Sequence, residues 1–171
     1  MEKRPVRRNN RLETWNYSSN GAYFITICIQ NRQCLLSHIV GGGVLDAPYV
    51  QLTETGEVVD YRIREMNRQY PEVQTEKYVI MPNHIHLLIR IAKEGNVISS
   101  GPSGTPAPTN AVIPAYISTL KRLCNQKLGK NIWQRSYHDH IIRNEADYQR
   151  IWSYIDTNPA KWEEDCFYTE E

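Results

Sequence analysis

The chain has 171 residues, of which 40% are hydrophobic and 23% are charged. This balance predicts one soluble globular domain and excludes a fibrous or disordered chain. No apolar run approaches the roughly 18 residues that a membrane span needs, and the basic start has no apolar stretch that could serve as a secretory signal, so we expect a cytoplasmic protein with no membrane partner. Four scattered cysteines without a C-x-x-C pair indicate reduced thiols.

The formal net charge of +1 hides a segregation of charge along the chain. Residues 1–11 carry five basic side chains against one acidic, and residues 163–171 carry five acidic side chains and no basic one. Residues 114–143 carry six basic side chains against one acidic, interleaved with Trp133 and Tyr137. A basic and aromatic segment favours nucleic-acid binding, and a solvated helix face beside a basic arm is the alternative.

The first part of the chain predicts two strands and a helix. Residues 22–30 alternate between two faces and are rich in strand-forming side chains, and a second short strand is expected near residues 35–40, before a glycine-rich surface loop. Residues 55–69 have apolar side chains at helical spacing, and Thr53 or Thr55 can cap the start of that helix.

A hairpin and a loop follow this helix. Two strands are expected over residues 77–81 and 84–91, joined at Pro82 and Asn83, because proline does not fit in the middle of a sheet. Residues 93–113 contain Gly, Pro, Ser and Thr too densely for regular structure and predict a flexible loop.

The last part of the chain predicts a helix, a strand and a final helix. Helical spacing resumes over residues 114–128 and ends at Gly129. A strand is expected over residues 137–143 and a helix over residues 145–158, which Pro159 ends. The whole order of elements predicts an α+β fold, in which helices pack on an antiparallel sheet.

His84 and His86 are the sharpest chemical feature of the sequence. Residues two apart on a strand point to the same face, so both imidazoles project together, opposite to the apolar row that begins with Ile85 and Leu87. Two imidazoles suit a divalent metal ion, although a third ligand must come from elsewhere. The alternative is a pair of half-exposed histidines with no ligand.

Tyr154 and Asn158 lie four residues apart in the last predicted helix and therefore share one of its faces. Asn158 offers a carbonyl oxygen to a hard cation, and Tyr154 offers a hydroxyl nucleophile that needs activation because its ordinary pKa is near ~10. The alternative is that Tyr154 is an aromatic residue at the border of the core and that Asn158 caps the helix.

Three segments together resemble a known family. They are YVIMPNHIHLLI at 78–89, WQRSYHDHIIR at 133–143 and YIDTNPAKW at 154–162. In sequence and order they are similar to the REP-associated tyrosine transposases, a branch of the single-tyrosine HUH transposases. The resemblance divides the chain into a basic arm (1–19), a transposase domain (20–162) that includes the flexible loop, and an acidic tail (163–171).

The resemblance implies a fold and a reaction. The fold is a ferredoxin-like antiparallel sheet with helices packed on one face. His84 and His86 would bind Mg or Mn, Asn158 would complete the metal site, and Tyr154 would be the nucleophile. The reaction is cleavage and rejoining of single-stranded DNA next to palindromic hairpins through a 5′-phosphotyrosine intermediate, with no nucleotide cofactor. A domesticated, non-cleaving, sequence-specific DNA-binding protein is the alternative, and both a homodimer and a monomer are compatible with the sequence.

The implied partner is single-stranded DNA that carries a hairpin. The side chains expected to contact it are basic or aromatic, namely Arg7, Arg8, Arg11, Lys121, Arg122, Trp133, Arg135, Tyr137 and Arg143. The cations would contact phosphates, and Trp133 or Tyr137 would stack on an unpaired base. The role of His138 and His140 stays open between a second ligand pair, phosphate contacts and plain surface residues.

Overall fold

The computed structural model describes residues 19–42, 47–92 and 111–169. Its elements, in chain order, are β1 (Gly21–Cys28), the 3-10 turn η1 (Gln30–Arg32), β2 (Ser37–Val40), β3 (Tyr49–Leu52), α1 (Glu54–Gln69), β4 (Val73–Ile80), β5 (His84–Ile91), α2 (Val112–Leu128), β6 (His138–Ile142), α3 (Glu145–Thr157) and the 3-10 helix η2 (Pro159–Glu164). Nearly all of the expected basic arm, with Arg7, Arg8 and Arg11, and most of the expected flexible loop lie outside the described residues. None of the described helices is long and apolar enough to cross a membrane.

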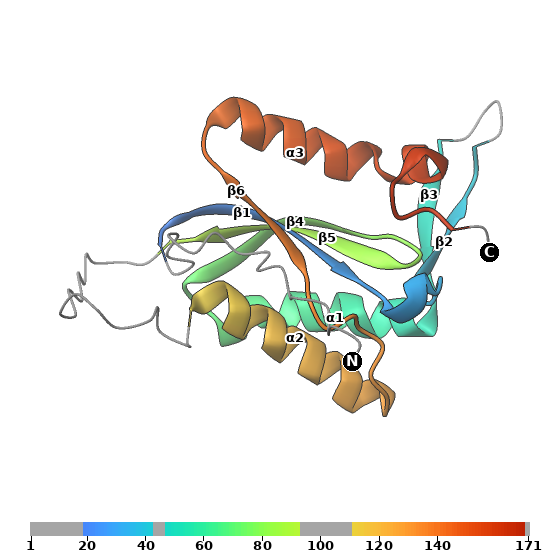
Figure 1. The fold of residues 1–171 in the computed structure, drawn as a ribbon, viewed down its shortest axis with the longest axis horizontal. Helices are drawn as coiled ribbons and strands as arrows, with labels where there is room; N and C mark the ends of the chain where they lie inside the picture. Colours follow the sequence, from blue (N-terminus) through green and yellow to red (C-terminus); the bar gives the residue numbers. More distant parts are fainter. Residues whose placement is uncertain (1–18, 43–46, 93–110, 170–171) are drawn as a thin grey trace, which may run out of the picture.

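A four-stranded antiparallel sheet organises the molecule, with the strand order β4-β5-β1-β6. α1 connects β1 to β4 by way of the β2–β3 hairpin, and α2 connects β5 to β6, which gives the interleaved topology of a ferredoxin-like fold. The predicted α+β fold is therefore confirmed. Figure 1 shows α1 and α2 on one face of this sheet and α3 on the opposite face. The expectation that the helices pack on one face therefore holds for α1 and α2 but not for α3.

The main hydrophobic core lies between the sheet and the layer formed by α1 and α2. Its buried side chains from the central strands include Tyr23, Ile25, Ile27, Ile85, Leu87 and Ile89, and those from the helices include Val59, Ile63, Met66, Tyr116, Leu120 and Cys124. Because strand side chains alternate between faces, the remaining residues of β1 and β5 point toward α3. A smaller cluster of Leu88, Ile151 and Ile155 packs α3 onto that second face.

The structure differs from the predictions most clearly at β3, β4 and α2. The sequence pattern did not predict β3, which pairs with β2 in a separate two-stranded sheet. β4 begins at Val73 instead of Lys77, because a shift in its pairing with β5 between Thr75 and Lys77 interrupts the alternation that marks a strand. α2 begins at Val112, so that Pro114 lies in its first turn, where proline is tolerated.

Candidate metal and nucleophile site

The face of the sheet beneath α3 carries the histidine pair. His84 and His86 are 0% and 1% exposed, and their Nε2 atoms lie 3.0 Å apart. This separation is close to the distance between neighbouring ligand atoms in an octahedral site whose metal–ligand bonds are about 2.1 Å long. One cation could therefore bind both nitrogens. The shared face agrees with the prediction, and the burial overturns the alternative of two half-exposed histidines.

Hydrogen bonds at the Nδ1 atoms fix the direction in which both rings face. Asn83 Oδ1 lies 2.9 Å from His84 Nδ1, and Thr26 Oγ1 lies 2.9 Å from His86 Nδ1. Asn83 lies in the turn between β4 and β5, and Thr26 is the partner of His86 in the β1–β5 ladder, so the backbone places both groups. With Nδ1 occupied, each Nε2 is left for a ligand, as is usual for metal-binding histidines.

Burial also favours the neutral form of both imidazoles. Desolvation lowers the pKa of His84 to about 4, although the nearby carboxylate of Asp165 acts in the opposite direction. Desolvation and the neighbouring His84 hold the pKa of His86 well below its ordinary value. The neutral imidazole is the form that binds a metal ion.

α3 brings Tyr154 and Asn158 to the histidines. Tyr154 Oη lies 3.3 Å from His86 Nε2, and the Tyr154 ring makes an edge contact with Phe24 of β1. Asn158 caps the end of α3 and is 2% exposed, and its Oδ1 has no hydrogen-bond partner among the described residues. Burying an oxygen without a hydrogen-bond partner costs free energy, and coordination to a bound cation would compensate for this cost. The structure thus brings the four predicted site residues together, and the donor set fits a divalent cation.

Asp165 is a site residue that the sequence analysis did not predict. Its Oδ2 accepts hydrogen bonds from Tyr154 Oη at 3.2 Å and from Asn158 Nδ2 at 2.9 Å. One ligand atom each from His84, His86 and Asp165 lies within 4.8 Å of the other two, a group that could hold a metal ion. The only signal in the sequence was that Asp165 is the single aspartate among the glutamates of the acidic tail.

The environment of Tyr154 keeps its hydroxyl protonated. Burial, followed by the charge of the Asp165 carboxylate, raises the pKa of Tyr154. Tyr154 is nevertheless 37% exposed, so part of the residue remains open to solvent. A ligand can therefore reach part of this residue from solvent, while its hydroxyl lies beside His86 and Asp165.

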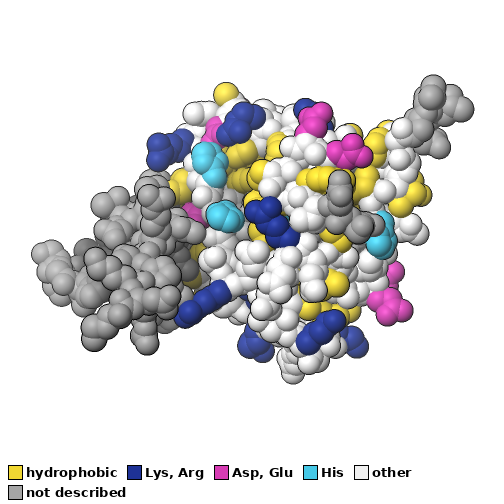
Figure 2. Space-filling model, turned by 45° about the vertical axis from the view of Figure 1, so that its right-hand side comes forward, with side chains coloured by type: hydrophobic (Ala, Val, Ile, Leu, Met, Phe, Trp, Pro, Cys, Tyr) yellow, Lys and Arg dark blue, Asp and Glu magenta, His cyan; other side chains and the backbone are white. Residues whose placement is uncertain are grey.

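Three of the expected DNA contacts are exposed arginines. Arg122, Arg135 and Arg143 lie on the surface, and no ion pair joins any of them to an acid in the part of the chain that the structure describes. Figure 2 shows Lys and Arg side chains spread over one face of the molecule, together with exposed histidines. Cations without acidic partners are available to an anionic ligand.

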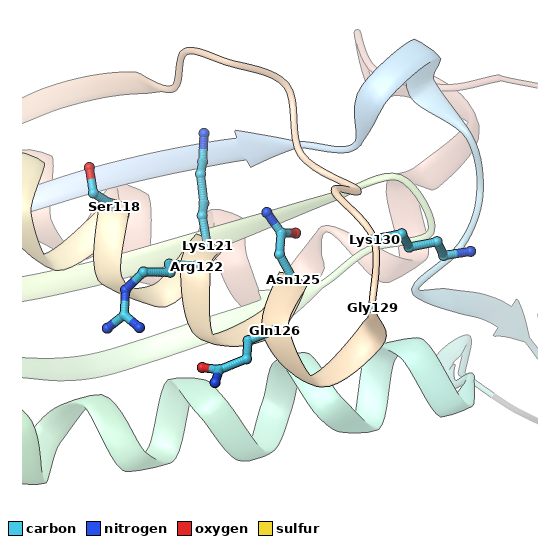
Figure 3. A pocket seen from close by; sticks show the side chains of 7 residues that line it. All are labelled: Ser118, Lys121, Arg122, Asn125, Gln126, Gly129 and Lys130. Carbon is cyan, nitrogen blue, oxygen red and sulfur yellow. The ribbon is translucent and has the colours of Figure 1, made fainter.

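A hollow beside the second half of α2 gathers part of this basic segment. It is lined by Ser118, Lys121, Arg122, Asn125, Gln126, Gly129 and Lys130 (Figure 3). Lys121 points out of α2 toward β1, whereas Arg122 points to the other side of the helix. Lys121 Nζ donates to the carbonyls of Gln134 and Ser136, at 2.7 and 2.9 Å, and burial lowers the pKa of Lys121 to about 8. Lys121 therefore braces the loop that follows α2, in contrast to the free phosphate contact that we expected.

The prediction that Trp133 stacks on an unpaired base is wrong. Its side chain is 2% exposed and packs in the main core, because a β-bridge between Ile29 and Trp133 draws this segment against the end of β1. Tyr137, the other expected stacking residue, is partly buried against the same core.

His138 and His140 lie on β6, and neither belongs to the cluster of His84, His86 and Asp165. His140 Nε2 lies 2.7 Å from Asp147 Oδ2 of α3, while His138 is exposed and pairs with Thr26 along the β1–β6 ladder. No group of metal-binding side chains among the described residues includes either histidine, so the structure gives no support to a second ligand pair.

The chain is similar in sequence or fold to several known proteins. No family model matches the chain. The chain is 35% identical to an uncharacterized protein of Haemophilus influenzae, over 96% of this chain and 94% of that protein. It is 25% identical to the REP-associated tyrosine transposase of Escherichia coli, over 85% of this chain and 70% of that protein. A solved structure of a REP-associated tyrosine transposase bound to a REP hairpin has a TM-score of 0.58 at 22% identity, covers 93% of this chain and 74% of that one, and shares the fold.

Proposed function

We propose, from the premise that this chain belongs to the family of REP-associated tyrosine transposases, that it is a metal-dependent transposase which cleaves and rejoins single-stranded DNA beside palindromic hairpins. The observation that carries the proposal is the meeting of Tyr154 with the histidine pair, at 3.3 Å from His86 Nε2. DNA binding alone does not require a phenol beside two converging imidazoles, so this arrangement favours catalysis. A relative of known structure is bound to a REP hairpin, which supports hairpin DNA as the partner.

The metal site would be formed by His84, His86 and Asn158. The two Nε2 atoms converge, and the buried Asn158 Oδ1 lacks a partner among the described residues, so the donors present fit a divalent ion, Mg or Mn. When bound, such an ion supplies Lewis-acid polarisation of a phosphate and stabilises charge on its non-bridging oxygens. Asn83 and Thr26 hold the two imidazoles in the orientation that this requires.

Tyr154 would act as the nucleophile in an in-line attack on the scissile phosphorus. A bond forms between Tyr154 Oη and phosphorus, the bond from phosphorus to the 3′ oxygen of the leaving strand breaks, and the phenolic proton ends on that 3′ hydroxyl. The product is a 5′-phosphotyrosine, and because a phosphodiester replaces a phosphodiester, the reverse step can rejoin strands without a nucleotide cofactor. The partial exposure of Tyr154 allows a strand to contact this residue from solvent.

The DNA would be held largely by phosphate contacts from Arg122, Arg135 and Arg143. All three are exposed and lack acidic partners among the described residues. Arg122 lies on α2, in the helix layer on the opposite face of the sheet from the histidines, and Arg135 lies in the loop between α2 and β6, outside the histidine site. Binding and chemistry would therefore depend on separate residues, which allows them to be tested separately.

The experiment is incubation of the full chain with a hairpin-bearing single-stranded oligonucleotide that is labelled at its 3′ end, with Mn²⁺ or Mg²⁺. We expect a covalent product that survives denaturing electrophoresis and disappears in excess chelator. The domesticated, non-cleaving alternative predicts retained hairpin binding without any covalent product. A covalent product that forms equally well in chelator would contradict the metal site.

A further inference from the structure

The carboxylate of Asp165 reaches the histidine pair from a segment that the sequence analysis assigned to a tail. Residues 165–169, which follow η2, fold back over the site, and the Phe167 ring lies 4.7 Å from the His84 ring. Asn83 Nδ2 donates to the Phe167 carbonyl at 2.8 Å, while the oxygen of the same amide faces His84. One side chain in the β4–β5 turn therefore fixes both a histidine and the segment that carries Asp165.

The two oxygens of Asp165 have different roles. Oδ1 accepts from the backbone N–H of Phe167 at 2.7 Å, an ordinary turn contact that aspartate often makes. Oδ2 instead points to the site, where the Tyr154 hydroxyl and the Asn158 amide both donate to it. A turn requires only the first oxygen, so the placement of Oδ2 needs another explanation.

The ligands already assigned supply no negative charge. Two neutral imidazoles and an amide oxygen would leave the positive charge of a divalent ion uncompensated. The site is buried, because His84, His86 and Asn158 are each at most 2% exposed. Burying such a charge without an anionic partner is costly. Among the described residues, Asp165 is the acid whose ligand atom lies within 4.8 Å of both histidine nitrogens, and the Asn158 Nδ2 contact leaves Asn158 Oδ1 free to bind the same ion.

We propose that Asp165 is the anionic ligand of the divalent cation, carried into the site by the segment 165–169. This inference rests on the proposed function and adds a fourth protein ligand to it. The hydrogen bond from Tyr154 Oη to the same carboxylate places the nucleophile beside the ligand set. A carboxylate in this position also fits the preference of Mg²⁺ and Mn²⁺ for oxygen donors.

The test is titration of the full chain with MnCl₂, in which binding is measured by calorimetry and by the electron paramagnetic resonance signal of free Mn²⁺. Asp165→Asn keeps the shape of the side chain and removes its charge, and we expect it to weaken Mn²⁺ binding by about tenfold or more. Asp165→Glu keeps the charge and should restore part of the affinity. Glu164→Gln is the matched control, because it removes one exposed acid from the adjacent position, and its Mn²⁺ affinity should stay within about twofold of wild type.

The outcomes separate this inference from the proposed function. If His86→Ala abolishes Mn²⁺ binding while Asp165→Asn leaves it unchanged, Asp165 is not a ligand and the proposed function stands. Faster formation of the covalent product by Asp165→Asn would also overturn the inference, because the segment would then obstruct the site. If the wild-type chain forms no covalent product with hairpin DNA, the proposed function fails, while the Mn²⁺ titrations still decide whether Asp165 binds the ion. Thermal melting in chelator checks that each variant folds.

Discussion

Lys77 Nζ lies 2.6 Å from Oδ1 of Asp156, which ties β4 to α3 two residues beyond Tyr154. The same nitrogen lies 4.1 Å from the centre of the Trp152 ring, two residues before Tyr154. The pairing shift in β4 leaves Glu76 as an extra residue beside Lys77, and Glu76 accepts a hydrogen bond from Tyr148 of α3. Consecutive residues of β4 thus hold the helix that carries the proposed nucleophile.

Replacing Lys77 by methionine should loosen α3 without disturbing DNA binding. The methionine keeps the apolar stem and removes the interactions of the ammonium with Asp156 and the Trp152 ring, so we expect a decrease of about 1 kcal/mol in the free energy of unfolding, measured by urea denaturation. The rate of covalent product formation should fall at unchanged hairpin affinity. Arg64→Met is the control, because it removes an ion pair to Asp60 and a hydrogen bond to Tyr78, both on the α1 side of the sheet and away from α3. An unchanged rate in Lys77→Met would show that this interaction does not position Tyr154.

The faces of the central strands could be predicted because alternation with a period of two requires no tertiary information. Ile85 and Leu87 mark the core side of β5, so His84 and His86 had to share the other side. The i, i+4 spacing likewise placed Tyr154 beside Asn158, and both now contact Asp165. Burial of the histidines could not be predicted, because it depends on contacts between residues distant in sequence, such as Tyr154 and His86, 68 positions apart.

Other parts of the site escaped prediction for the same physical reason. Asp165 lies in irregular chain after η2, where no periodicity indicates which way a side chain points. Trp133 was misjudged because an aromatic residue in a basic segment is compatible with either a surface or a core position, and only its bridge to Ile29 decides between them. Local pattern thus predicts the faces of helices and strands, whereas long-range contacts determine which of those faces are covered.

Gly56 marks a close approach between α1 and the chain that precedes β2. A Cβ on Gly56 would lie 2.0 Å from the Leu36 carbonyl oxygen, which already accepts from the Thr53 backbone N–H at 2.9 Å. Gly56→Ala should therefore destabilise the fold by about 1–3 kcal/mol, despite the better helix propensity of alanine. The control is Gly129→Ala, where an added Cβ meets no atom but φ is +68°, and about 1 kcal/mol is expected. Equal stability of Gly56→Ala and wild type would contradict this packing.

Removing Arg122 or Arg135 should weaken hairpin binding, because each guanidinium is expected to neutralise a DNA phosphate. Each alanine variant should lower affinity at low salt and reduce the slope of log affinity against log salt by about 0.7–0.9 for every phosphate that is no longer neutralised. Filter binding or fluorescence anisotropy over a salt series measures both quantities. Arg150→Ala is the matched control, because Asp147 already neutralises that arginine, so a small effect is expected. Affinity that does not depend on salt would contradict phosphate binding at these positions.

The metal site predicts a graded response to removal of its ligands. His84→Ala or His86→Ala should abolish strand cleavage and leave hairpin affinity nearly unchanged, because the proposed phosphate contacts lie elsewhere. Asn158→Ala should reduce cleavage less severely, since water can replace one neutral oxygen ligand. Chelator should reproduce the histidine variants, and added Mn²⁺ or Mg²⁺ should reverse its effect. Full activity of His86→Ala in chelator would remove the basis for a metal-dependent reaction.

Tyr154→Phe removes one oxygen from the site and preserves the ring that contacts Phe24, so the fold should survive with a destabilisation of about 1 kcal/mol or less. Strand cleavage and the covalent product should both vanish, while hairpin affinity stays near wild type, because no other phenol is expected to replace this nucleophile. Tyr61→Phe is the matched control, because the Tyr61 hydroxyl donates a hydrogen bond to Glu65 on α1. Activity should therefore be retained in this variant. Mass spectrometry of the wild-type product should locate the DNA on Tyr154. An adduct on Tyr137 or Tyr148, or one that forms in the phenylalanine variant, would make the nucleophile assignment wrong even if the proposed family were right.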